Sequence, residues 1–418
     1  MKRIVKQLYF VIFQLRPKLF TMNPGQRLLS LDFLRGLIMV LLAFEASGLY
    51  HHLTTASDDS VWHGLMLQFD HHPWNGLRFW DLVQPGFMFI AGTAMAYSIT
   101  KQRQQGMTWM QTFRKALRRS GWLFFWGVLD YAVRRSGLSF ELWNVLTQLS
   151  FTTLVAFLVF NWSYRNQALI CVALLLLTEV LYRFTNIPGF DQPFTDQKNF
   201  GNWMDLQLMN TINKGGWVAI NCIPTAVHTI AGAMVGKFLL QQTGIIVKKP
   251  TANLDSPAAD AAQGTVAASV SDRNTKVSAS LRPLLFWGLI SLIVGYGLDW
   301  TGITPIIKRI ATTSFTMASL GWCLWALAAC YWWIDILQHR KYLRFFTIVG
   351  MNSIFIYLFF EIVGARWFNG YVGAVTNGLM SFVNVPELPM LIITSLCIFT
   401  LEWLMCYFLY KKKIFFRV

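Results

Sequence analysis

The sequence predicts an all-α, polytopic transmembrane helix bundle with about ten spans. Charged residues make up only 13% of the 418 residues, whereas a soluble domain carries about 25%. Hydrophobic residues make up 55%, and the mean hydropathy is +0.42. The apolar residues also form runs long enough to cross a bilayer as helices. Because lipid offers backbone groups no hydrogen-bond partners, each of these runs should be helical.

Ten such runs follow one another along the chain. They cover residues 28–49, 79–99, 117–133, 143–162, 166–184, 216–240, 283–299, 312–335, 345–363 and 388–410. Lys and Arg are concentrated before the first run, after the last run, and in alternate connections between them. Because basic connections stay on the cytoplasmic side, we expect both termini in the cytoplasm.

The same pattern divides the chain into four parts. Residues 1–26 form a basic, amphipathic cytoplasmic segment without a signal-peptide cleavage site. Residues 27–241 hold spans one to six and an outer loop at 50–78. Residues 242–281, rich in Ala, Ser, Thr and Asp, are predicted to be a flexible cytoplasmic linker. Residues 282–418 hold spans seven to ten.

Composition also excludes some classes of protein. The net charge of +16 does not indicate nucleic-acid binding, because the basic residues lie between apolar runs and form no single patch. All six cysteines lie inside apolar runs and are interpreted as small buried hydrophobic residues rather than disulfides or zinc ligands.

The predicted outer loop has an unusual content of histidine. It holds five of the seven histidines in the chain: His51, His52, His63, His71 and His72. Imidazole titrates near neutral pH and can act as base, nucleophile or ligand. For any one of these histidines taken alone, a solvated polar loop is the favoured interpretation. The spacing matches no recognised metal motif, so no metal is expected.

Polar groups in the spans offer further candidates. Asp32 and Arg35 lie one turn apart, either as a structural ion pair or facing a polar channel. Glu45 has no basic partner within one turn, which favours a functional role. His228 and Asn352 lie in polar stripes that also suit interhelical hydrogen bonds.

A cationic segment precedes the eighth span. Lys308 and Arg309 come just before Thr312 and Ser314 near a helix start, where cations and hydroxyls could hold an anion. Interfacial snorkelling of the two cations is the structural alternative.

Five segments in order resemble the heparan-α-glucosaminide N-acetyltransferase family. They are RLLSLDFLRGL at 27–37, HHPWNGLRFWDLVQPGFMFIAG at 71–92, NFGNWMD at 199–205, PIIKRIATTSF at 305–315 and VGMNSIFIY at 349–357. The resemblance implies transfer of acetyl from cytosolic acetyl-CoA to the amine of a terminal glucosamine across the membrane. It also implies that His71, three residues before Trp74, is the catalytic histidine.

The predicted site residues follow from this resemblance and from the polar groups above. The catalytic set is His71, the adjacent His72, and Asp70, Asp81 and Glu45 as groups that could orient the imidazole. The set predicted to bind the acceptor sugar is Trp74, Asn75, Asp32, Arg35, Asn199 and Asp205. The set predicted to bind acetyl-CoA is Lys308, Arg309, Thr312, Ser314, Asn352 and His228.

Departures from the family pattern concern the acceptor more than the reaction. Glu45 and Ala46 stand where the family often has an Asn, and Thr147-Gln148 stands where it has Gln-Arg. An O-acetyltransferase of a surface glycan and a transporter of small polar solutes remain alternatives.

The expected partners are the lipid bilayer and an amino-sugar or glycosaminoglycan-derived acceptor, with no nucleic acid. A homodimer is compatible with the sequence. The absence of the lumenal N-terminal region of animal relatives suits a bacterial inner-membrane protein.

Overall fold

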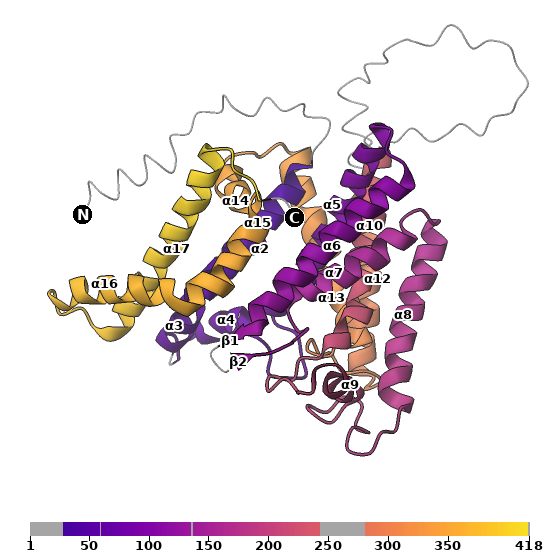
Figure 1. Cartoon of the computed structure of the whole chain (residues 1–418), viewed down its shortest axis with the longest axis horizontal. Helices are drawn as coiled ribbons and strands as arrows, with labels where there is room; N and C mark the ends of the chain where they lie inside the picture. The colour runs from indigo at the N-terminus through magenta and orange to yellow at the C-terminus, as the bar shows by residue number, and fades with distance from the viewer. Residues whose placement is uncertain (1–27, 59, 135–136, 243–280, 417–418) are drawn as a thin grey trace, which may run out of the picture.

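A computed structural model describes residues 28–58, 60–134, 137–242 and 281–416 (Figure 1). The described chain is helical except for one short hairpin, in which β1 (Val133–Arg134) pairs antiparallel with β2 (Gly137–Leu138). The predicted N-terminal segment and nearly all of the predicted linker lie outside the described residues.

The part of the chain before residue 243 includes the predicted outer loop at 50–78. Its helices are α2 (Leu29–Ala46), α3 (Leu49–Ala56), α4 (His63–Met66), η1 (Leu67–Phe69), η2 (Phe79–Leu82), α5 (Val83–Gln104), α6 (Trp109–Ala132), α7 (Val145–Val159), α8 (Tyr164–Phe184), α9 (Phe200–Met209), η3 (Ala219–Asn221) and α10 (Cys222–Gln242).

The part after residue 280 includes two π-helical segments, η4 and η5. Its helices are α12 (Leu281–Trp300), α13 (Thr313–Cys330), η4 (Tyr331–Ile336), α14 (Leu343–Gly350), α15 (Ser353–Leu358), η5 (Phe359–Phe368), α16 (Asn369–Ser381) and α17 (Glu387–Lys411).

Among the residues that the structure describes, six helices are long and apolar enough to cross a membrane, and a seventh candidate runs through α14 to α16 with a bend of 72°. The chain is therefore a multi-pass membrane protein. A helix overlaps each of the ten predicted runs, but three of these helices do not meet the criteria of length, hydropathy and charge for a membrane span. The α2 helix carries three charged residues, α6 is basic in its first half, and α7 has only 15 residues.

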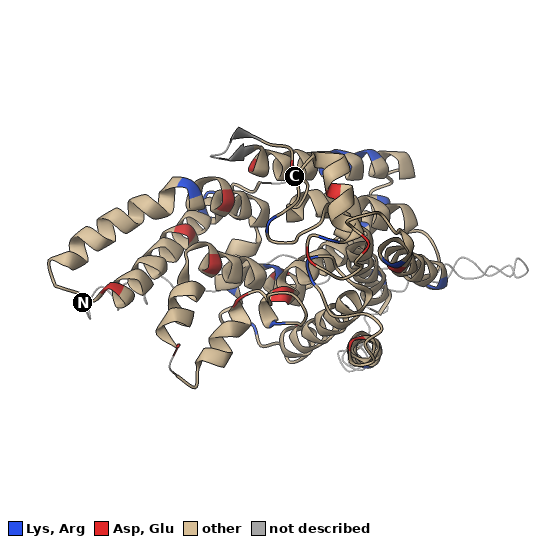
Figure 2. Cartoon of the chain, turned by 90° about the horizontal axis from the view of Figure 1, so that it is seen from below, with Lys and Arg blue, Asp and Glu red and all other residues tan. Residues whose placement is uncertain are grey.

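The helices form two groups that meet at α2. In Figure 1, α14, α15 and α17 lie with α2 on one side, and α5, α6, α7, α8, α10, α12 and α13 lie on the other. The α2 helix packs against α14 and α17 and also against α5 and α13. The α3 and α4 helices, the hairpin and α9 gather at one end of the bundle (Figure 1). Long stretches of several helices carry no charged residue (Figure 2), whereas basic residues gather in the first half of α6.

The α5 and α10 helices approach so closely that their backbones touch. A Cβ atom at Gly92 would clash with the carbonyl oxygen of Thr229, and a Cβ atom at Gly232 would clash with that of Phe89. Gly236 follows Gly232 with the four-residue spacing of small residues common where membrane helices meet. Because α5 begins directly after the outer loop, this contact fixes the position of that loop along the axis of the bundle.

We expect Gly232→Ala to destabilise the fold, because the added methyl group meets backbone atoms that cannot move aside. Overpacking of this kind costs about 1–3 kcal/mol. The thermal unfolding temperature of the purified protein should fall. Gly297→Ala is the matched control, since a Cβ atom there meets nothing within 4 Å. Equal unfolding temperatures for the two variants would contradict the close packing of α5 and α10.

Candidate active site

The candidate site lies in the loop from His71 to Arg78, between η1 and η2. The backbone N–H of Gly76 donates to the carbonyl oxygen of Ile306 at 2.8 Å, which ties this loop to the connection between α12 and α13. Gly76 has φ +142°, and a Cβ atom there would overlap the imidazole of His72. The glycine therefore allows the tight turn that brings the loop back toward the start of α5.

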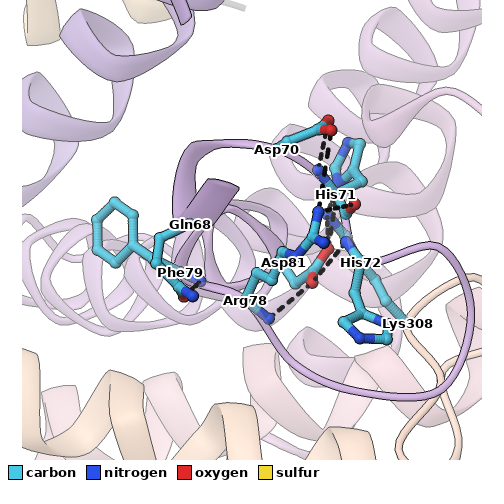
Figure 3. Close-up of polar contacts among 8 residues, drawn as sticks. All are labelled: Gln68, Asp70, His71, His72, Arg78, Phe79, Asp81 and Lys308. Atoms are coloured by element: carbon cyan, nitrogen blue, oxygen red, sulfur yellow. Dashed lines mark hydrogen bonds and ion pairs between the residues drawn. The ribbon is translucent and has the colours of Figure 1, made fainter. Parts of the chain in front are cut away.

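Asp81, in η2, is the residue around which the polar contacts of this loop gather (Figure 3). Its side chain is 1% exposed, and its Oδ1 lies 3.0 Å from Nδ1 of His71 and 3.5 Å from Nζ of Lys308. Its Oδ2 accepts hydrogen bonds from the backbone N–H groups of Arg78 at 2.9 Å and His72 at 3.3 Å. A buried carboxylate needs this number of partners, because an unpaired charge away from water is costly.

The contacts around Nδ1 of His71 determine which nitrogen holds the proton. Nδ1 lies 3.0 Å from the Asp81 carboxylate and 3.1 Å from the Lys308 ammonium. It can donate to the carboxylate or accept from the ammonium, but a neutral ring nitrogen cannot do both. An unprotonated Nδ1 would place its lone pair against the carboxylate. We therefore assign the proton to Nδ1, which leaves Nε2 as the unprotonated nitrogen.

Burial shifts both basic groups toward their neutral forms. It lowers the pKa of His71 below its ordinary value of 6.5; the nearby Lys308 also lowers it, and the hydrogen bond to Asp81 opposes the shift. Burial lowers the pKa of Lys308 to about 8, opposed by the charge of Asp81. His71 is thus held as a neutral imidazole at neutral pH, beside a lysine that can lose its charge under mildly alkaline conditions.

Two further charged groups hold the backbone of His71. Nη1 of Arg78 donates to the His71 carbonyl oxygen at 2.9 Å, and the His71 N–H donates to Oδ1 of Asp70 at 2.8 Å. Arg78 and Asp70 also form an ion pair at 3.9 Å. Asp70 therefore positions the backbone of His71, while Asp81 contacts its imidazole (Figure 3).

His71 opens into a cavity of about 240 Å³ between the two groups of helices. Six of its sixteen lining residues are Trp, Tyr or Phe. Its polar lining comes from segments distant in sequence: Glu45, Gln84, Asn144, Lys308, Tyr357 and Glu361. Its aromatic and apolar lining is Met39, Leu42, Trp80, Val83, Phe87, Tyr131, Trp143, Val145 and Trp217.

A polar network behind the cavity joins α6, α7 and η5. Nδ2 of Asn144 donates to Oδ2 of Asp130 at 2.8 Å, while its Oδ1 accepts from the N–H of Leu146 and caps α7. Arg366 donates to the carbonyl oxygen of Asp130 at 2.7 Å and lies 3.8 Å from its carboxylate. The network connects η5 to the cavity wall opposite His71.

Gln148 takes part in a second contact next to the cavity. It hydrogen bonds to Gln84, and its side-chain N–H donates to the carbonyl oxygen of Trp143 at 3.3 Å. The position at which the family pattern has an arginine thus holds a neutral residue that supports two cavity-lining residues.

The structure brings together four of the predicted residues at the cavity: His71, Glu45 and Lys308 line it, and Asp81 lies directly behind His71. His72 contributes its backbone N–H to Asp81, but its imidazole packs against Gly76 outside the cavity lining.

Most residues predicted to bind the acceptor serve other contacts. Trp74 donates to the carbonyl oxygen of Phe194 at 2.8 Å, and Asn75 is exposed on the loop. Asp32 and Arg35 lie 3.9 Å apart at the start of α2. None of these four residues lines the cavity.

Two of the predicted acceptor residues belong to α9. Asn199 caps this helix through the N–H of Asn202. The carboxylate of Asp205 accepts hydrogen bonds from Nε1 of Trp143 and the N–H of Ala219, both at 2.9 Å, and burial raises its pKa to about 7. Asp205 therefore reaches the cavity only indirectly, by positioning Trp143.

The predicted acetyl-CoA set is dispersed. The hydroxyl groups of Thr312 and Ser314 both bind the carbonyl oxygen of Pro305 at 2.7 Å, so they close the loop before α13. Arg309 lies 5.9 Å from the ring of Trp74. His228 is buried against Ser319, and Asn352 binds the backbone near Phe416. Only Lys308 of this set lines the cavity.

Sequence reasoning assigned no role to several cavity residues. Trp143, Asn144 and Trp217 fall at the starts of the fourth and sixth predicted spans, but the structure has them in the loops before α7 and η3. Tyr357 and Glu361 are polar residues of the ninth predicted span. The sequence marked Asn144, Tyr357 and Glu361 only as polar residues within apolar runs, and it did not mark Trp143 or Trp217. No group of three or more His, Cys, Asp or Glu that could hold a metal occurs in the part of the chain that the structure describes.

Comparison with known proteins agrees with the motifs of the outer loop. Residues 27–259, more than half of the chain, match the family described as heparan-alpha-glucosaminide N-acetyltransferase, catalytic. The chain is similar to the heparan-alpha-glucosaminide N-acetyltransferases of Mus musculus, at 35% identity over 107 residues, and Homo sapiens, at 32% over 103 residues. These matches cover 26% and 25% of this chain but only 14% and 13% of the relatives. The chain carrying the His71–Asp81 site therefore belongs to the heparan-alpha-glucosaminide N-acetyltransferase catalytic family.

Proposed function

We propose that the protein is a transmembrane N-acetyltransferase that moves acetyl from cytosolic acetyl-CoA to the amine of a glucosamine-type sugar outside the membrane. Family membership supports an acyltransferase. The observation that carries the proposal is a neutral imidazole, oriented by a buried carboxylate, at the wall of a cavity between the helices. A histidine held in this way is suited to general-base or nucleophilic catalysis.

In the direct route, Nε2 of His71 takes a proton from the sugar ammonium. The freed amine attacks the acetyl carbon, and the nitrogen of the tetrahedral intermediate gives up a second proton to water as the carbon–sulfur bond of the thioester breaks. The proton held by His71 passes to the thiolate that leaves. Asp81 stabilises the imidazolium that forms. Lys308, which lines the same cavity, provides positive charge for the oxygen of the tetrahedral intermediate.

In the two-step route, Nε2 of His71 attacks the thioester first, the carbon–sulfur bond breaks and the thiolate leaves. His71 then carries the acetyl group as an acetyl-imidazolium, whose charge Asp81 balances. The sugar amine then attacks this carbonyl carbon and releases the imidazole. Both routes need the same unprotonated Nε2. Acetyl-enzyme that accumulates without acceptor in a single turnover would select the second route.

We further propose that all ten helical segments cross or enter the bacterial inner membrane, with both termini cytoplasmic. The distribution of Lys and Arg between the segments supports this orientation. It places the His71 loop, α3, α4 and α9 on the periplasmic side. The cavity would then receive the sugar from outside and the acetyl group from between the helices.

The proposed reaction predicts N-acetylation of glucosamine by membranes that contain the protein and are supplied with acetyl-CoA. The product is detected by mass spectrometry, with membranes lacking the protein as control. Purified protein should also bind CoA, which a transporter of small polar solutes would not. Acetylation of hydroxyl groups alone would exclude the proposed amine acceptor.

His71→Ala should lower acetyl transfer by about 10²–10⁴-fold, the usual contribution of a positioned acid–base group. The variant should reach the membrane in normal amounts, because the His71 side chain is 35% exposed. His51→Ala is the matched control: it removes an exposed histidine of the same outer region and should retain activity. Full activity in His71→Ala would show that another residue carries the chemistry.

The two lowered pKa values predict a bell-shaped dependence of kcat/KM on pH. Activity should fall as pH drops below the pKa of His71, which lies under 6.5, because protonated imidazole cannot act as base. It should fall again as pH rises through about 8, where Lys308 loses its charge. The measurement is kcat/KM from about pH 5 to about pH 10. The Lys308→Gln variant should lose the decline in kcat/KM at alkaline pH. An unchanged pH profile would show that Lys308 takes no part in the reaction.

A further inference from the structure

We propose that Glu402, Asn369 and the carbonyl oxygen of Phe359 form a binding site for one alkali-metal cation between α17 and the π-helical segment η5. None of these three residues lines the His71 cavity, and the site is separate from the proposed acetyl transfer. Oxygen atoms from different places in the sequence converge there on the space beside one glycine, Gly364.

Glu402 is a carboxylic acid inside a membrane helix. It lies well within α17, a candidate membrane span, and it is 2% exposed. Neither oxygen of its side chain has a hydrogen-bond partner among the residues that the structure describes. An ionised carboxylate buried without a partner is costly, and ionisable groups inside membrane helices mark sites where a proton, an ion or a substrate binds.

Asn369 supplies a second oxygen without a partner. Its Nδ2 donates to the carbonyl oxygen of Ala46 at 2.7 Å, at the end of α2. Because that contact requires a donor, it fixes which end of the amide is the nitrogen. The other end, Oδ1, is buried and has no hydrogen-bond partner within the described part of the chain. An acceptor in this position lacks a cation or a donor.

The two unpartnered groups point to the same small space. Apart from the adjacent backbone of its own helix, a Cβ atom at Gly364 would have three nearest heavy atoms. They are Oδ1 of Asn369 at 3.5 Å, the carbonyl oxygen of Phe359 at 3.5 Å and Oε1 of Glu402 at 3.7 Å. All three are oxygens. A proton on Glu402 would give the group one donor, whereas one cation among the three oxygens would satisfy all of them.

The charge of the ligands selects the kind of ion. Glu402 supplies one negative charge, and the amide and carbonyl oxygens are neutral. A monovalent cation makes the site neutral, while a divalent cation would leave a net positive charge inside the membrane. Oxygen ligands suit hard cations, and carbonyl oxygens replace the hydration shell of alkali ions in channels. Functional sites are also frequent at π-helical turns such as η5.

A bound cation would connect elements that border the cavity. Glu402 belongs to α17, Phe359 begins η5, and Asn369 begins α16 and reaches the end of α2 through its amide. The α16 and α17 helices already pack against each other (Figure 1). The ion would therefore stabilise the packing of α17 on η5, the segment that carries the cavity residue Glu361.

The test compares thermal unfolding of the full-length protein in NaCl, KCl and choline chloride at equal ionic strength. Wild type should unfold at a higher temperature in at least one alkali salt than in choline chloride, by about 2 °C when the ion exceeds its Kd about tenfold. E402Q should lose this difference because it removes the charge that holds the ion. E387Q, which removes an exposed carboxylate at the start of the same helix, should keep it.

G364A tests the site without altering a ligand. Its methyl group would lie 3.5 to 3.7 Å from the three oxygens, which is ordinary contact, so the variant should fold while the methyl group fills the space of the ion. Its unfolding temperature in choline chloride should be no lower than that of wild type, and the effect of alkali salts should be absent. G378A, where a Cβ atom meets nothing within 4 Å, is the matched control and should keep the effect.

Equal unfolding temperatures of wild type in the three salts would overturn the site and would indicate that Glu402 holds a proton instead. An effect of alkali salts that persists in E402Q or in G364A would overturn it as well, because the ion would then bind elsewhere. Unfolding is measured without acetyl-CoA or acceptor. The outcome is therefore independent of whether the protein transfers acetyl groups.

Discussion

The carboxylate of Asp81 lies in the first turn of a membrane helix and is almost fully buried, so its charge must be matched by partners from the protein. The imidazole of His71, the ammonium of Lys308 and two backbone N–H groups supply this match. To provide them, the loop must turn back over η2, and the connection before α13 must reach across to it. One buried charge thus determines the path of two loops more than 200 residues apart.

The same interaction gives the imidazole its chemistry. Because Oδ1 of Asp81 accepts the hydrogen bond from the Nδ1–H group of His71, the other ring nitrogen carries no proton, and the ring belongs to a residue that lines the cavity. Burial keeps the ring neutral, and the neighbouring lysine reinforces this by making a second positive charge unfavourable. The arrangement combines a positioned base with a nearby cation, and both are supported by backbone contacts that do not depend on a ligand.

The cavity lies where the two groups of helices meet beside α2. The α5 and α10 helices are held together through glycines, which gives the wall at α5 a rigid backing. On the opposite wall, Arg366, Asp130 and Asn144 join η5 to α6 and α7. The irregular π-helical turn carries Glu361 into the space between these walls. Rigid walls with an irregular segment between them leave room for a ligand without loss of the surrounding packing.

The sequence by itself determined that the chain is a helical membrane protein of this family, because apolar runs and the local motif from His71 to Gly92 are read along the chain. It also indicated His71 and Asp81, which lie within one motif. It could not separate Asp81 from Asp70 as the partner of the imidazole, since that depends on how the loop turns. Tertiary structure alone placed Lys308 beside His71, apart from the other residues predicted to bind acetyl-CoA. It alone gathered Trp143, Trp217 and Glu361 around one cavity. Such contacts join residues far apart in sequence, and no local periodicity or spacing encodes which helices will meet.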